Sequence, residues 1–96
     1  MNGKIIVFNL NNLENKEAVK FCRHFYGYKD YSNNGKYKYH RKGLLDEIKH
    51  VKLGPGVIII LNEDFRKVAE FMKEYRIIYH VRTVELTGTD EESLTK

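Results

Sequence analysis

Tyrosine and cationic residues are interleaved in one segment of the chain, residues 26–42. Five of the seven tyrosines lie there together with five Lys or Arg residues, and Asp30 is the one acidic residue of the segment. Lysine and arginine neutralise phosphates, and tyrosine rings stack on nucleobases. The segment therefore predicts a surface that binds RNA or DNA. The residues predicted to make this contact are Lys29, Tyr31, Lys36, Tyr37, Lys38, Tyr39, His40, Arg41 and Lys42.

The same alternation is also typical of an ordinary half-exposed strand. In a regular strand Tyr37 and Tyr39 share one face, and the other face carries Lys36, Lys38 and His40. The two groups would reach one ligand only if strand twist or an edge position brought them together. The charges of a solvated strand would merely keep the protein soluble.

Metal-independent cleavage of RNA is a further interpretation. It needs a base for the 2′-hydroxyl, an acid for the leaving oxygen and a cation for the transition state. These groups could come from His40, His50, Tyr39 and Lys42 if their loops converge. Their spacing does not predict that convergence, so we assign no catalytic residue. We expect a binding protein rather than an enzyme, with an endoribonuclease as an alternative.

Neither a metal site nor a cofactor is predicted. Cys22 and His24 are two residues apart on a predicted helix, so their side chains diverge. Residues 54–56 hold two glycines but precede a strand, whereas a phosphate loop follows a strand and opens a helix. A single cysteine cannot form an intramolecular disulfide, and the chain begins without an apolar leader. Both features predict a cytoplasmic protein.

Charge and hydropathy narrow the class of partner. Residues 20–52 hold nine Lys or Arg residues and three acids, whereas residues 85–96 hold four acids and one lysine. This asymmetry predicts polyanion binding, with the acidic end a potential competitor for the basic surface. The longest apolar runs, residues 5–8 and 57–61, are far below the ~20 residues that span a bilayer, so no membrane contact is expected.

Apolar periodicity predicts the elements that position the basic segment. Residues 4–10 and 57–61 are apolar on both alternating faces, which is typical of central strands. Residues 14–26 have helical periodicity, with Asn11 and Asn12 as capping residues, and a second helix follows residue 62. Residues 77–86 form a more peripheral strand, and at least one strand lies between residues 36 and 53.

The order strand, helix, strand, strand, helix, strand predicts an α+β fold of the ferredoxin-like, split βαβ type (βαββαβ). We expect a mainly antiparallel sheet with both helices on one face. Residues 1–87 form the single domain, and residues 88–96 form a flexible acidic tail.

The other face of this sheet is aliphatic and too large to stay open in a monomer. We expect residues 26–53 or a second subunit to cover it, with a homodimer as the simpler arrangement. A protein-interaction or assembly module that recruits a protein partner through this face is therefore the main alternative to nucleic-acid binding.

Overall fold

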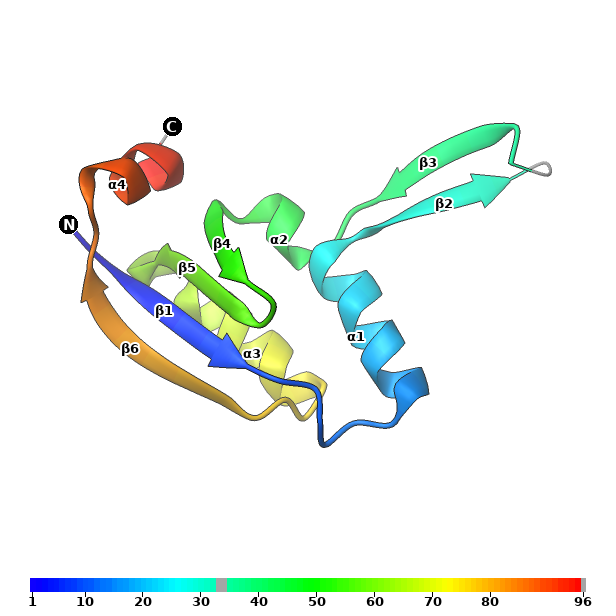
Figure 1. Cartoon of the computed structure of the whole chain (residues 1–96), viewed down its shortest axis with the longest axis horizontal. Coiled ribbons are helices and arrows are strands. Elements are labelled where there is room, and N and C mark those ends of the chain that lie inside the picture. The colour runs from blue at the N-terminus through cyan, green and yellow to red at the C-terminus, as the bar shows by residue number, and fades with distance from the viewer. Residues whose placement is uncertain (33–34, 96) are drawn as a thin grey trace.

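A computed structural model describes residues 1–32 and 35–95 of the chain and shows an α+β fold with a mainly antiparallel sheet (Figure 1). Lys96, the last residue of the predicted tail, lies outside the described residues. The strands are β1 (Asn2–Phe8), β2 (Tyr28–Ser32), β3 (Tyr37–Arg41), β4 (His50–Gly54), β5 (Val57–Leu61) and β6 (Tyr79–Glu85). The helices are α1 (Asn15–Tyr26), α2 (Leu44–Glu47), α3 (Phe65–Glu74) and α4 (Gly88–Thr95), with a 3-10 turn, η1 (Asn62–Asp64), before α3.

Four of the strands form one sheet in the order β4, β5, β1, β6, and every neighbouring pair is antiparallel. The two most apolar strands, β1 and β5, lie in the centre, as their sequences predict. Ile5 pairs with Ile59 and Ile6 with Ile58. One face of these strands lies against the main core and part of the other lies against a smaller apolar cluster, which accounts for apolar residues at successive positions. The more polar β6 lies at an edge, also as predicted.

Helices α1 and α3 cover the same face of this sheet. Phe21 and Phe25 of α1 are fully buried, and the ring centroid of Phe8 lies 5.8 and 5.6 Å from theirs in edge-on contacts. Val68 and Met72 of α3 are buried in the same core. These residues recur at helical spacing, so each helix presents one apolar stripe to the sheet. The amphipathic pattern therefore predicts the packing of both helices correctly.

The start of α1 differs from the prediction that asparagine side chains cap it. Glu14 precedes the helix, and its side chain makes no capping hydrogen bond. Asn12 instead donates from Nδ2 to the carbonyl oxygen of Arg76, at 3.0 Å. Arg76 follows α3 along the chain, so Asn12 ties the start of α1 to the end of the other large helix. Sequence spacing contains no signal for a contact between residues so far apart.

Helix α4 covers part of the opposite sheet face. Leu94 is fully buried and packs with Ile59 and Leu86. The sequence predicts a flexible tail at residues 88–96 and a cover made by residues 26–53 or a second subunit. The structure differs on the tail, because residues 88–95 form a helix that supplies part of the cover. A second subunit over the rest of this face stays a prediction. Leu94 docks the helix on the apolar surface of the sheet, and Glu91 adds an ion pair with the N-terminal ammonium at 3.6 Å.

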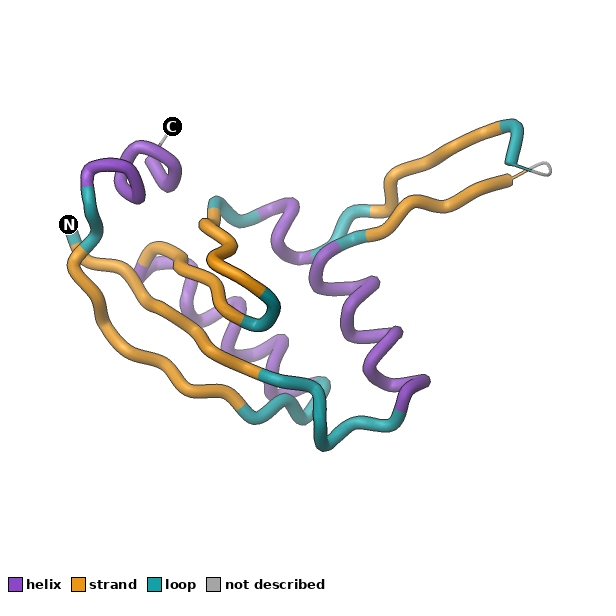
Figure 2. The backbone as a smooth tube through the Cα atoms, viewed as in Figure 1, coloured by secondary structure: helices purple, strands orange, loops and turns teal. Residues whose placement is uncertain are grey.

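Residues 26–53 do not cover this face. Leu45 and Ile48 are buried in the core on the opposite face, and β4 belongs to the sheet itself. Strands β2 and β3 pair only with each other and form a hairpin, β2–β3. Figure 2 shows that this hairpin extends away from the four-stranded sheet, beyond the end of α1. The hairpin makes the molecule elongated, with extents of 47 × 32 × 20 Å.

Candidate nucleic-acid interface

The hairpin β2–β3 gathers the predicted nucleic-acid residues on one projection. Those from Lys29 to Arg41 lie in its strands or its turn, and Lys42 follows β3 directly. Tyr31, Tyr37 and Tyr39 are 56%, 51% and 50% exposed. An isolated two-stranded hairpin gains little stability in water, and these three rings fill no core. Such rings add surface that a partner could bury.

Strand pairing divides the hairpin into two faces. Tyr28 pairs with Arg41 and Asp30 with Tyr39, whereas Lys29 pairs with His40 and Tyr31 with Lys38. Directly paired residues point to the same side of a sheet, and successive residues point to opposite sides. The tyrosine face therefore carries Tyr28, Asp30, Tyr37, Tyr39 and Arg41. The lysine face carries Lys29, Tyr31, Lys38 and His40.

Tyr37 and Tyr39 thus lie on one face of the hairpin, and Lys38 and His40 lie on the other, as the alternation predicts. What the sequence does not reveal is the contribution of β2. This strand adds Tyr31 to the lysine face and Tyr28 to the tyrosine face, so each face combines aromatic and cationic side chains.

An ion pair lies on the tyrosine face. Arg41 Nε donates to Asp30 Oδ2 at 3.1 Å, and the Arg41 guanidinium lies 6.0 Å from the centre of the Tyr39 ring. Asp30 therefore offsets part of the charge of Arg41. Within residues 1–32 and 35–95, the hairpin lysines make no ion pair and are exposed to solvent. These free cations are Lys29, Lys36, Lys38 and Lys42.

Asp46 of α2 anchors the base of the lysine face. Its Oδ2 accepts a hydrogen bond from the Gly43 backbone N–H at 2.8 Å and lies 3.0 Å from His40 Nε2. The Gly43 N–H, and then the contact with His40, hold the pKa of the Asp46 carboxyl below its usual range. His50 lowers this pKa further through its charge. Both contacts favour the ionised carboxylate at the junction of β3 and α2.

The residues considered for RNA cleavage are only partly brought together. His40 and His50 both act on the Asp46 carboxylate. However, His50 Nδ1 lies 2.9 Å from the Ile48 carbonyl oxygen, and Tyr39 belongs to the opposite face of the hairpin. The structure therefore does not place these side chains around one scissile bond.

Two glycines set the direction of the hairpin relative to α1. Gly27 ends the helix with φ of 81°, and a Cβ atom there would lie 2.6 Å from Asp46 Oδ2 and 2.7 Å from the Arg41 carbonyl oxygen. A Cβ atom on Gly43 would lie 2.6 Å from the Phe25 carbonyl oxygen. Only glycine permits the positive φ at Gly27 and the close backbone approach at both positions. The two ends of the hairpin are thereby held against the end of α1.

The tyrosine face continues onto the outer side of α1. The Arg23 guanidinium lies 4.9 Å from the centre of the Tyr28 ring, which links the helix to the first residue of β2. Beside this contact is a hollow of about 490 Å³, called the α1 groove below. It is lined by Asn15, Lys16, Val19, Lys20, Arg23, His24 and Tyr28.

The cations of the α1 groove are absent from the predicted site. Lys16, Lys20 and Arg23 are separated by four and then three residues, which places them on one side of the helix. That spacing is visible in the sequence and could have identified them. The tyrosine-rich segment drew the prediction to residues 29–42 alone.

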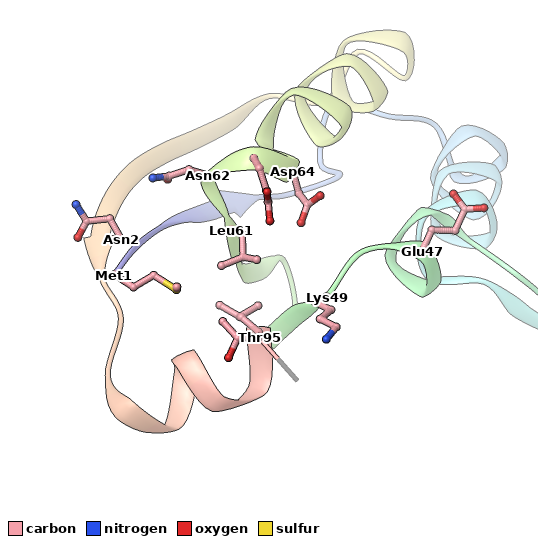
Figure 3. A pocket seen from close by; sticks show the side chains of 10 residues that line it. Met1, Asn2, Glu47, Lys49, Leu61, Asn62, Asp64 and Thr95 are labelled. Carbon is pink, nitrogen blue, oxygen red and sulfur yellow. The ribbon is translucent and has the colours of Figure 1, made fainter.

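A second hollow, of about 640 Å³, lies between α4, η1 and the end of α2, at the end of the sheet where the chain begins (Figure 3). Met1, Leu61 and Thr95 surround it together with three acids and a lysine, namely Glu47, Glu63, Asp64 and Lys49. Carboxylates repel phosphates, so this end is unsuited to a polyanion. Helix α4 lies at the same end (Figure 1), so its acids are far from the hairpin that they were predicted to compete for.

Two negative observations apply to the described part of the chain. Its His, Cys, Asp and Glu residues include no group of three or more placed to hold a metal ion. Its helices are all too short or too polar to cross a membrane.

Comparison of the chain with protein-family models, curated proteins and solved structures found no match. The surface described above therefore carries the candidate function.

Proposed function

We propose that the protein binds RNA or DNA through the hairpin β2–β3. The observation that carries this proposal is the projection of three half-exposed tyrosines and four unpaired lysines away from the body of the molecule. Lysines neutralise phosphates, and exposed tyrosine rings accept stacked bases. Phosphate contacts carry no sequence information, so binding is strongly salt-dependent and weakly sequence-specific.

The test is a quadruple alanine variant that removes Lys36, Lys38, Arg41 and Lys42. Its matched control removes four cations on α3 and the edge strand β6, Arg66, Lys67, Lys73 and Arg82. Fluorescence anisotropy with labelled RNA and DNA follows binding from low to near-physiological salt. The slope of log K against log salt is negative, and each lost phosphate contact reduces its magnitude by about 0.7 to 0.9. We expect a large loss of affinity in the hairpin variant and a small loss in the control.

Equal losses in the two variants would mean that net charge, and not the hairpin, determines binding. The absence of binding by the native protein at low salt would refute the proposal outright. The same samples are resolved on a denaturing gel. Cleavage of RNA that is lost on His40→Ala, while binding is retained, would support the endoribonuclease alternative.

An assembly function is the second candidate, and it has its own observation. Val7 lies on the sheet face that α4 partly covers, yet it is 42% exposed. Leu53, in the edge strand β4, is 57% exposed. An uncovered apolar strip at this end of the sheet suits a protein partner, of which a second copy of the chain is the simplest.

For the fold, we infer the split βαβ arrangement of ferredoxin-like proteins. Its support is that β1 and β4 run parallel with β5 between them, while β5 and β6 run parallel with β1 between them. The hairpin β2–β3, α2 and α4 are additions to that arrangement. A cytoplasmic location is proposed with it, on the strength of the single free Cys22.

A further inference from the structure

The α1 groove and the tyrosine face form one continuous surface. Arg23 lines the groove and also lies over Tyr28, whose face of the hairpin includes Tyr37 and Tyr39. Lys16, Lys20 and Arg23 are exposed and make no ion pair with any residue in the described ranges. A ligand that crosses this surface meets a row of cations on the helix and then a row of rings on the hairpin.

We propose that this surface binds a single strand of RNA or DNA, with its phosphates along α1 and its bases on Tyr37 and Tyr39. The inference rests on the proposed function and adds the strandedness of the ligand and the path that it follows. The separation of cations from rings carries it, because a single strand also has its phosphates on one side and free bases on the other.

The geometry of the rings favours a single strand over a duplex. Tyr37 and Tyr39 are two residues apart in one strand, so their side chains emerge about 6.8 Å from each other. Bases within a duplex strand are stacked about 3.4 Å apart, and neither face of an inner base is free for a tyrosine. An unstacked strand can place a base on each ring, whereas a duplex would have to open first.

The rings of this path lie on the tyrosine face of the hairpin. The lysine face has one aromatic residue, Tyr31, which points to the opposite side of the hairpin and is as exposed as Tyr37 and Tyr39. Tyr31→Ala therefore compares a ring on the other face with the two rings of the proposed path. Lys67 and Lys73 of α3 are exposed cations on another helix, and they serve as the control for Lys16 and Lys20.

The experiment measures the anisotropy of a labelled 12-nucleotide single strand, as RNA and as DNA, and of a duplex of the same sequence. Stacking is worth about 1–3 kcal/mol per base, so Tyr37→Ala with Tyr39→Ala should weaken single-strand binding at least tenfold. Replacement of both rings by Phe keeps the stacking surface and should restore binding. Lys16→Ala with Lys20→Ala should lower the salt slope by about 1.4, at ~0.7 for each phosphate. We expect Tyr31→Ala to weaken single-strand binding less than the Tyr37/Tyr39 variant does, and the Lys67/Lys73 control to bind like the native protein.

The outcomes separate this inference from the proposed function. Tighter binding of the duplex, or native binding by the Tyr37/Tyr39 alanine variant, would overturn the single-strand path while leaving hairpin-mediated binding intact. Equal losses in the lysine variant and its control would remove α1 from the path. Binding of poly-glutamate as tight as that of the nucleic acid would show that charge alone is recognised and would overturn stacking. If no nucleic acid binds, the inference and the proposed function both fail.

Discussion

The Asp46 carboxylate joins the hairpin to α2. It accepts a hydrogen bond from the backbone of Gly43 and contacts His40 of the lysine face. These contacts favour its ionised form and lower its pKa from the ordinary value of 3.8. A group whose pKa is lower in the folded state stabilises that state above its unfolded pKa, and the stabilisation is lost as the pH falls through the folded value.

Asp46→Asn removes this charge and keeps an acceptor oxygen in nearly the same place. At pH 7 we expect the variant to unfold at a lower urea concentration than the native protein. The difference should shrink as the pH falls below 3.8 and vanish below the lowered pKa of the folded state. Urea unfolding from pH 7 to pH 2 measures it. Glu47→Gln removes a neighbouring charge on α2, and a similar pH dependence in that control would contradict the role of Asp46.

At the residue scale, the sequence predicts the face on which a side chain lies better than it predicts the contacts of that side chain. Alternation alone places Tyr37 and Tyr39 opposite Lys38 and His40. The pairing of Asp30 with Arg41 depends on the register of β2 against β3, which the sequence does not show. The contact of Asp46 with His40 likewise depends on where α2 turns back. Both contacts decide which cations remain free for a ligand, so this part of the candidate site needs the structure.

At the scale of elements, α4 is the main departure from the prediction. Residues 88–95 contain one large apolar side chain, Leu94, which is too weak a pattern to predict a helix. The helix is held because that side chain is fully buried against Leu86 and Ile59. Tertiary packing therefore decides its structure, as it does for most short helices.

Leu94→Ala should release α4 from the sheet. Truncation of a fully buried leucine costs about 2–5 kcal/mol, and the small cluster here favours the lower end of that range. The exposed face should then bind an apolar dye such as 1-anilinonaphthalene-8-sulfonate (ANS). Urea unfolding and dye fluorescence test both effects, with the exposed Ser93→Ala as the control. If Leu94→Ala matched Ser93→Ala in both measurements, α4 would not be docked in solution.

The hairpin is a second element that the sequence shows only in part. Residues 36–41 alternate clearly and are predicted as a possible strand. The sequence does not reveal β2, because Asp30 interrupts its pattern and because the strand starts only one residue after the helix. By contrast, β1, β5, α1 and α3 each carry a strong apolar pattern, and the structure contains all four. Elements that fill the core are predictable from periodicity, whereas those that project from it are not.

The whole molecule is less compact than its length suggests. A 96-residue domain is expected to have a radius of gyration of roughly 12–13 Å, and the value here is 14.7 Å. The hairpin accounts for the excess because it extends along the longest axis (Figure 1). A projection without a core of its own is more consistent with a surface for a partner than with a contribution to stability.

The uncovered end of the sheet predicts self-association. If two copies bury Val7 and Leu53 against each other, light scattering should give about twice the monomer mass of 11.4 kDa. The dimer should persist at high salt, because burial of apolar surface is not screened. Leu53→Lys should convert it to the monomer, whereas Val19→Lys, at an equally exposed position of α1, should not. A native protein that is monomeric at the highest concentration measured would contradict the homodimer.

The acids around η1 and α4 and the cations of the hairpin lie at opposite ends of the 47 Å axis. Such a separation gives the molecule a permanent dipole moment. A polyanion would orient the molecule so that its acidic end points away from the strand. The hairpin and α1 would then face the strand, and the acidic end of the 47 Å axis would lie away from it. The exposed acidic ends would repel one another, which would limit crowding as the strand fills.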